Sequence, residues 1–264
     1  MQEFRYEAAG VRLYAKQQGS GRAIVMLHGG GADHRACLAC VAPISARYHV
    51  VVPDLRGSGR SWCADQLTWD RLAEDVHGLL DHIGAGRAVV GGISMGSGVA
   101  LRFARRFPER TAGLVALAPV YGGEELGFTR YQAATFASLG PVLARAPQEG
   151  IEAFRPLYQK SPAMEAYFDG MIGSLDLASF IATNQFMASG AQPFASARDL
   201  ESIAAPALLV RGNDPMHPPE ISDLYAARIV RCTTVDLSNK SDDENRNAAI
   251  AAAIEDFCER SAVW

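Results

Sequence analysis

Short apolar runs recur along this chain and restrict its fold more than any other feature. Most of them are apolar at consecutive positions rather than at alternate ones, which is typical of strands buried on both faces of a sheet. Helical patterns separate most of the runs, and this alternation predicts right-handed βαβ units in a mostly parallel, doubly wound α/β sheet. The runs are Ala23–Leu27, Tyr48–Pro53, Arg87–Gly91, Gly113–Ala118, Ala207–Arg211 and, more weakly, Thr233–Leu237.

Three helices are indicated between and after these runs. The first is predicted over Thr68–Ile83, with Thr68 as its N-cap and Gly84 as its stop signal. The second covers Gly96–Phe107 and ends at a proline, and an Ala/Ile-rich helix over Ala248–Cys258 closes the chain.

The alternation stops between about Tyr121 and Arg198, where only amphipathic helical stretches rich in Ala, Phe, Tyr and Met occur. We expect the prolines of this region to divide it into short pieces. We interpret it as a helical cap inserted between two strands, with extra scaffold as the alternative. The predicted organisation is a core of residues 1–120 and 199–264 and a cap of residues 121–198.

Composition excludes several classes of protein. The chain has 264 residues, 48% of them hydrophobic, and a net charge of −4 without a basic stripe, so we expect no nucleic-acid partner. There is no signal-peptide pattern and no apolar run long enough for a membrane span, which predicts a cytoplasmic location without membrane attachment. The five cysteines include the C-x-x-C pair Cys37 and Cys40, which we interpret as two buried thiols because no second pair completes a metal site.

The pentapeptide Gly92-Ile93-Ser94-Met95-Gly96 matches G-x-S-x-G and lies between a predicted strand and a predicted helix. In that setting the strand must turn sharply into the helix, so the serine is strained and larger neighbours would collide. The Ser94 hydroxyl would then stand at the carboxyl edge of the sheet, beside the positive end of a helix. We therefore predict that Ser94 is a nucleophile; an incidental serine in a glycine-rich turn is the alternative.

A second glycine-rich segment, His28-Gly29-Gly30-Gly31, follows the first of these strands. Tetrahedral intermediates need two backbone N–H donors aimed at the oxyanion, and we assign them to Gly30 and Met95. We expect His28 to hold this loop in shape rather than to act as a base. The segment from Asp54 to Ser61 (DLRGSGRS) lacks the G-K-[ST] of a phosphate loop, so we interpret it as a structural turn in which Asp54 and Arg56 form hydrogen bonds.

These motifs, HGGG, DLRGSGRS, GISMG and the later GND-P, resemble in order and interval those of the α/β-hydrolase superfamily, over nearly the whole chain. The resemblance implies an eight-stranded sheet, a Ser–His–acid triad, water as the usual acceptor, and neither metal nor cofactor. It places the triad acid at Asp214, directly after the strand Ala207–Arg211, with Glu124 or Glu125 as weaker alternatives. It leaves the substrate open, although a serine nucleophile argues against the epoxide and haloalkane branches.

The chain departs from the family pattern at the catalytic base. The family's histidine follows the last strand, but no histidine occurs after His217, and Lys240 stands near the expected place. Three explanations remain open. His217, three residues beyond the acid, would be the base from a neighbouring loop; Lys240 would be the base, although acidic neighbours keep it charged; or the usual triad is absent.

His34, shortly after the oxyanion loop, would contact the substrate or be a solvated loop residue. The sequence predicts a hydrolase that attacks a small to medium ester, thioester or lactone through Ser94, with Asp214 and His217 as its partners. The alternatives are a C–C bond hydrolase or lyase acting on a diketone or enol, and a non-catalytic protein that binds a small molecule. The sequence does not indicate an oligomeric state.

Overall fold

The computed structural model describes residues 1–65, 67–239, 243–260 and 264. An eight-stranded sheet runs through the molecule in the order β1-β2-β4-β3-β5-β6-β7-β8. Strands β1 and β2 form an antiparallel hairpin, β2 pairs antiparallel with β4, and every pairing from β4 onward is parallel. The strands are β1 (Gln2–Ala8), β2 (Val11–Gln18), β3 (Ala23–Leu27), β4 (His49–Pro53), β5 (Ala88–Ile93), β6 (Thr111–Leu117), β7 (Ala207–Val210) and β8 (Cys232–Val235).

All six predicted strands are present, with ends shifted by at most two residues, so the mostly parallel α/β sheet is confirmed. The hairpin of β1 and β2 was not predicted. It lies at the edge of the sheet, and most residues of β1 alternate between exposed and covered positions, which gives a weaker apolar signal than a central strand. Its turn uses Ala9 and Gly10, both with positive φ, at 46° and 78°.

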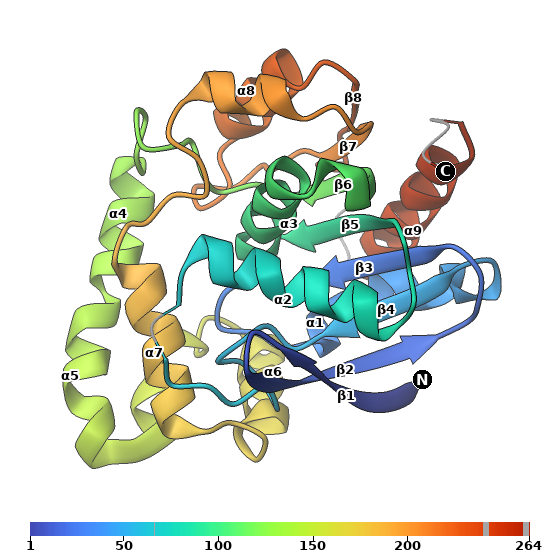
Figure 1. Ribbon diagram of the computed structural model, residues 1–264. Coiled ribbons are helices and arrows are strands. Elements are labelled where there is room, and N and C mark those ends of the chain that lie inside the picture. Colours follow the sequence, from blue (N-terminus) through green and yellow to red (C-terminus); the bar gives the residue numbers. More distant parts are fainter. Residues whose placement is uncertain (66, 240–242, 261–263) are drawn as a thin grey trace.

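Helices cover both faces of the sheet, as Figure 1 shows. Two apolar layers fill the space between sheet and helices: α2 (Trp69–His82), α3 (Met95–Arg106) and α8 (Pro219–Arg228) pack into one, and α1 (Arg35–Val41) and α9 (Asp243–Arg260) into the other. Helix α2 begins and ends as predicted, because the Thr68 hydroxyl accepts the Arg71 amide at 3.1 Å and Gly84 takes a φ of 66°. The doubly wound arrangement therefore follows from local sequence signals.

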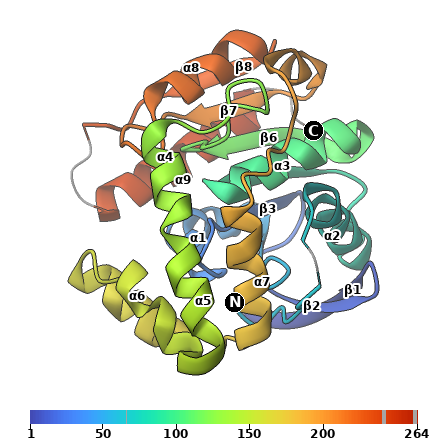
Figure 2. The ribbon, with the colours of Figure 1, turned by 90° about the vertical axis from the view of Figure 1, so that its left-hand side faces the viewer.

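The segment between β6 and β7 contains helices only, and Figure 2 looks onto them from the side on which they cover the sheet. They enclose an apolar cluster of their own, centred on Phe154, Phe168 and Phe180. The helices are α4 (Arg130–Ala137), α5 (Leu139–Glu149), the 3-10 helix Gly150–Leu157, α6 (Pro162–Ile172), α7 (Leu177–Ala188) and the 3-10 helix Ala197–Ser202. The expectation that each proline separates two pieces was wrong for Pro147 and Pro156, which lie within α5 and the following 3-10 helix. Each lies near the end of its helix, where a missing N–H removes only one hydrogen bond.

Within the described part of the chain, no helix combines the length and the apolar character that crossing a membrane requires.

Candidate active site

Ser94 occupies a sharp turn between β5 and α3. Its φ of 53° and ψ of −115° are unfavourable for a residue with a side chain, and its amide donates to the carbonyl oxygen of Leu117 at 3.0 Å. The side chain caps no backbone amide of the helix and is partly exposed. The strained turn thus leaves the hydroxyl free to react.

The two glycines of the pentapeptide are required by close backbone contacts. A Cβ atom at position 92 would lie 2.2 Å from the carbonyl carbon of Gly96, and one at position 96 would lie 2.3 Å from the carbonyl oxygen of Leu27. No side chain fits at such distances without moving the backbone. The crossing of strand and helix therefore depends on both glycines, as the sequence predicts.

His217 lies between Ser94 and Asp214. Its Nε2 atom is 2.9 Å from the Ser94 Oγ, and its Nδ1 atom is 2.9 Å from one Asp214 oxygen and 3.1 Å from the other. A nitrogen facing a carboxylate carries the proton, so Nε2 is left as an acceptor for the serine hydroxyl. This order of hydroxyl, imidazole and carboxylate is the geometry of a serine hydrolase triad.

A tight turn after β7 brings the acid and the imidazole together. The Asp214 Oδ1 atom accepts the backbone amides of Met216 at 2.8 Å and His217 at 2.9 Å. Gly212 allows the turn to fold back on itself, because a Cβ atom there would lie 2.2 Å from the His217 carbonyl oxygen. The sequence analysis did not single out Gly212, although its place directly after the strand is a usable signal.

The Asp214 carboxyl group is held in its charged form. Partial burial disfavours the charge, but hydrogen bonds and the attraction of His217, together with the Met216 amide, outweigh it and hold the pKa of Asp214 below its usual value. A carboxylate that stays ionised can orient the imidazole and stabilise it when it becomes protonated.

The glycine-rich loop after β3 lies beside the nucleophile. A Cβ atom at Gly29 would be 3.5 Å from the Cβ of Ser94, so the backbone of this loop passes close to the serine. Met95 is the first residue of α3, and its amide has no acceptor within the helix. The Gly30 and Met95 amides remain our candidates for the oxyanion donors.

His28 has the structural role that we expected. Its buried ring donates from Nδ1 to the Gly29 carbonyl oxygen at 2.7 Å and accepts the Leu55 amide on Nε2 at 2.9 Å. Both nitrogens are used, and burial lowers the pKa of His28, so the ring is kept neutral. It ties the glycine-rich loop to the turn after β4.

The structure corrects our expectation for His34. His34 is only 5% exposed, and Asp54 Oδ1 accepts hydrogen bonds from both its backbone amide at 2.8 Å and its ring Nδ1 at 2.7 Å. His34 is therefore not a solvated loop residue, and its small exposed surface argues against the expected contact with substrate. It is buried because the buried Asp54 carboxylate needs hydrogen-bond donors. Its other oxygen accepts the Arg60 amide at 2.8 Å, which confirms the structural reading of this turn.

Glu124 and Glu125, the weaker candidates for the acid, are exposed, and it is Asp214 that bonds to His217. Lys240, the alternative base, lies outside the described residues. Cys37 and Cys40 are buried, unpaired thiols, as expected, and burial raises the pKa of Cys40 to about 12.

Potential metal-binding atoms gather once in the described part of the chain, at Asp33, His34 and Asp54. They are already engaged, because the Asp33 carboxylate accepts from the Arg35 guanidinium at 2.8 to 3.0 Å and His34 is bonded to Asp54. This hydrogen-bonded group needs no ion to satisfy it.

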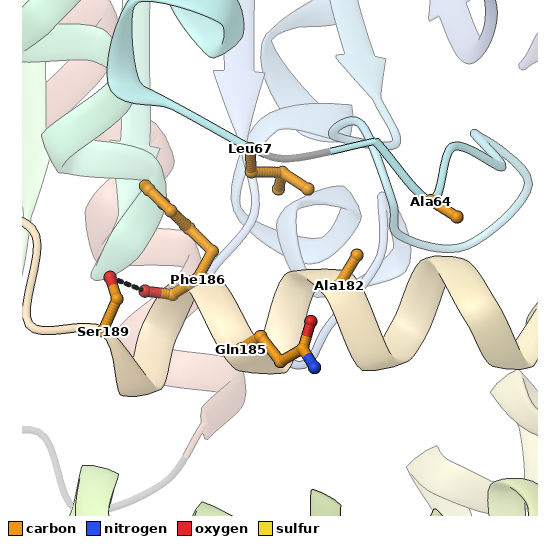
Figure 3. Close-up of a pocket in the computed structure, with 6 residues that line it drawn as sticks. All are labelled: Ala64, Leu67, Ala182, Gln185, Phe186 and Ser189. Carbon is orange, nitrogen blue, oxygen red and sulfur yellow. Dashed lines mark hydrogen bonds between the residues drawn. The ribbon is translucent and has the colours of Figure 1, made fainter. Parts of the chain in front are cut away.

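Two cavities lie on opposite faces of α7. One, of about 390 Å³, is lined by Gly30 and Gly31 of the oxyanion loop and by residues of the inserted helices. The other, of about 400 Å³, lies between α7 and the segment around Leu67 and is shown in Figure 3. Its lining residues are Ala64, Leu67, Ala182, Gln185, Phe186 and Ser189, and none of them belongs to the candidate triad or its oxyanion loop. The first cavity is therefore the one that adjoins the candidate oxyanion loop, although Ser94, Asp214 and His217 are not among its lining residues.

Comparison with known families agrees with this geometry. The model of the alpha/beta hydrolase family matches residues 24–240, which includes the glycine-rich loop, the serine turn and the turn with Asp214 and His217. The chain belongs to this family. The match confirms the resemblance seen in the sequence motifs and makes a hydrolase the expected kind of enzyme.

Curated relatives of this alpha/beta hydrolase include hydrolases named for unsaturated 2-hydroxy-6-oxo acids. A 2-hydroxy-6-oxo-6-phenylhexa-2,4-dienoate hydrolase of Burkholderia cepacia is 32% identical over 163 residues, which is 58% of this chain and 50% of the relative. A 2-hydroxy-6-oxononadienedioate/2-hydroxy-6-oxononatrienedioate hydrolase of Comamonas testosteroni is 32% identical over 156 residues, 56% of this chain and 48% of the relative. The alignments thus span about half the length of these relatives.

Solved structures share the fold over the whole chain. A thermophilic esterase from Thermogutta terrifontis superposes with a TM-score of 0.78 at 24% identity, covering 100% of both chains. An enol-lactonase from Burkholderia xenovorans LB400 has a TM-score of 0.75 at 22% identity, covering 96% of this chain and 98% of the other. An epoxide hydrolase from Bacillus megaterium reaches 0.77 at 18% identity, covering 97% and 100%, so the fold alone does not select a reaction.

Proposed function

We propose that this alpha/beta hydrolase cleaves a small to medium carboxylic ester, thioester or lactone through an acyl-enzyme on Ser94. The observation that carries the proposal is the continuous chain of short contacts from the Ser94 Oγ to His217 Nε2, at 2.9 Å, and from His217 Nδ1 to Asp214, at 2.9 Å. An uncharged serine hydroxyl is a weak nucleophile, and a base within hydrogen-bond reach activates it.

The geometry supports a two-step reaction. His217 Nε2 takes the hydroxyl proton while the Ser94 oxygen bonds to the carbonyl carbon, and the Gly30 and Met95 amides bind the resulting oxyanion. When the intermediate collapses, the bond to the alcohol or thiol breaks, and the leaving group receives the proton from His217. A water molecule then repeats the sequence on the acyl-enzyme, which releases the acid and restores Ser94.

A second candidate, cleavage of a C–C bond next to a ketone, is favoured by the relatives. The substrate named for the Burkholderia cepacia relative contains a hydroxydienoate and a ketone in one molecule. The same residues would serve that reaction, with the serine hydroxyl either adding to the ketone or assisting water. Because the alignment covers half of that relative, we rank this reaction second.

Intact-protein mass spectrometry during turnover of 4-nitrophenyl butyrate tests the proposal. We expect a mass increase equal to one butyryl group in the wild type and none in Ser94→Ala, with Ser202→Ala, an exposed serine on a 3-10 helix, as the matched control. Hydrolysis that continues in Ser94→Ala would refute the proposal. Turnover of a 2-hydroxy-6-oxo-dienoate without any acyl-enzyme would favour the second candidate, and turnover of neither substrate would favour a binding protein.

The expected partner is a small molecule. A cytoplasmic location also remains a proposal; the five cysteines support it, since all are free and disulfides are rare in the cytosol.

A further inference from the structure

The cavity next to the oxyanion loop is shaped by the inserted helices. Its floor is Gly30 and Gly31, and the other side is formed by α4, α5, α7 and the segment around Tyr158. Since Gly29 of the same loop passes close to Ser94, we expect a substrate that acylates the serine to direct one of its halves toward this space. The volume of about 390 Å³ is at the lower end of the range of small-molecule sites.

Most of the cavity wall is apolar. Flexible thioethers and aliphatic side chains dominate, which suits a hydrocarbon chain of variable shape better than a sugar or a nucleotide. The apolar lining residues are Phe136, Leu139, Pro156, Leu157, Met164 and Met187.

Five polar side chains interrupt this wall: Thr135, Ser138, Tyr158, Lys160 and Asn184. The Tyr158 hydroxyl donates to the Gly31 carbonyl oxygen, and the Ser138 hydroxyl donates to that of Thr135. Asn184 is 2% exposed, and its amide nitrogen donates to the Phe180 carbonyl oxygen at 2.8 Å. This hydrogen bond fixes the orientation of the Asn184 amide at the cavity wall.

Lys160 is the charged residue of the lining and is itself exposed. No carboxylate among the described residues lies within 4.0 Å of its ammonium group, and the nearby Glu165 instead accepts from Gln159 at 3.3 Å. A largely apolar cavity whose lining includes one cation without a carboxylate partner matches a hydrocarbon chain that ends in an anion.

We propose that this cavity holds the acyl half of the substrate and that Lys160 selects acyl chains ending in a carboxylate. The preferred substrates would be monoesters or monothioesters of dicarboxylic acids. Ser94 would bond to the far carbonyl carbon, the alcohol or thiol would leave with the proton from His217, and water would release the dicarboxylic acid. The inference rests on the proposed function and specifies its substrate class.

The test compares two 4-nitrophenyl esters of the same acyl length: mono-4-nitrophenyl adipate, which ends in a carboxylate, and 4-nitrophenyl methyl adipate, in which that end is a neutral methyl ester. An exposed ion pair changes an equilibrium by up to about fivefold, so we expect the wild type to favour the anion in kcat/KM by about three- to fivefold. The preference should decrease as NaCl screens the pair. It should vanish in Lys160→Met and persist in Lys160→Arg.

Lys16→Met serves as the matched control, because Lys16 lies on β2 and pairs with Glu3 at 3.1 Å. An equal preference in the wild type and in Lys160→Met would overturn the inference, as would a wild-type preference for the neutral ester. A preference for a carboxylate placed on the alcohol half would show that the cavity takes the other half of the substrate.

A binding measurement separates this inference from the proposed function. In Ser94→Ala, calorimetry with monomethyl adipate and dimethyl adipate reports recognition without catalysis. We expect tighter binding of the anion, lost on adding Lys160→Met. Equal binding of the two overturns the role of Lys160 whatever the reaction is, whereas hydrolysis surviving in Ser94→Ala overturns the proposed function alone.

Discussion

Replacing Asp214 with asparagine removes a charge while preserving the turn that holds His217. In Asp214→Asn, the amide oxygen can still accept the Met216 and His217 backbone amides, now at 2.8 and 2.9 Å from Oδ1. The NH₂ group takes the place of the oxygen that lies 2.9 Å from His217 Nδ1. An NH₂ group donates, so it favours the imidazole tautomer with its proton on Nε2, and that nitrogen can no longer accept from Ser94.

The expected loss follows from this tautomer change. Exchange of the triad acid for its amide lowers kcat by about 10⁴-fold in the best-studied serine protease, equivalent to about 5 kcal/mol of barrier. The Asp214 side chain is 51% exposed, so water partly replaces its effect on the imidazolium. We therefore expect a smaller loss in kcat, of about a thousandfold, with little change in Tm.

The assay is hydrolysis of 4-nitrophenyl butyrate with thermal unfolding measured in parallel. Asp236→Asn is the matched control, since Asp236 follows the neighbouring strand β8 and accepts the Ser238 amide at 2.8 Å in a similar turn. The control should keep its activity. A loss below tenfold in Asp214→Asn at unchanged Tm would refute the assigned role of the carboxylate.

Three further changes test the supports of the site. Gly96→Ala should lower the unfolding free energy by about 1–3 kcal/mol in urea titrations, because the added Cβ would lie 2.3 Å from the Leu27 carbonyl oxygen. Unchanged stability would contradict the close approach of α3 to the end of β3. Tyr158→Phe removes a hydroxyl that donates to the Gly31 carbonyl oxygen, and it should reduce kcat by up to about tenfold with KM nearly constant. A change in KM alone would argue against a role of Tyr158 in positioning the oxyanion loop. Burial lowers the pKa of His28, so just below pH 6.5 the unfolded chain gains a proton at this residue and the folded protein does not. The free energy of unfolding should therefore fall as the pH drops through this range, and it should fall less steeply in His28→Gln. Equal slopes in the two proteins would contradict a neutral buried ring.

Features coded locally were predictable from the sequence. The central strands, the N-cap at Thr68 and the glycines around Ser94 depend on neighbouring residues, and the structure has them at the predicted places. The N-terminal hairpin was missed because one of its faces is largely exposed and its apolar signal is diluted.

The candidate site was harder to predict because it depends on contacts between distant segments. Ser94 and His217 are 123 residues apart, and the sequence left His217 as one of three explanations for the base. What brings them together is the turn closed by Gly212 and Asp214, whose geometry a motif does not show. His34 was misjudged for the same reason, since its partner Asp54 lies on another loop.

The central claim is that His217, from the loop after β7, activates Ser94. The most direct measurement is the rate at which a fluorophosphonate probe labels the protein, with the modified peptide identified by mass spectrometry. We predict stoichiometric labelling of Ser94 in the wild type and a rate lower by about a thousandfold or more in His217→Ala, as expected for loss of a triad base. Labelling of Ser94 in His217→Ala at a rate within tenfold of the wild type would contradict the account.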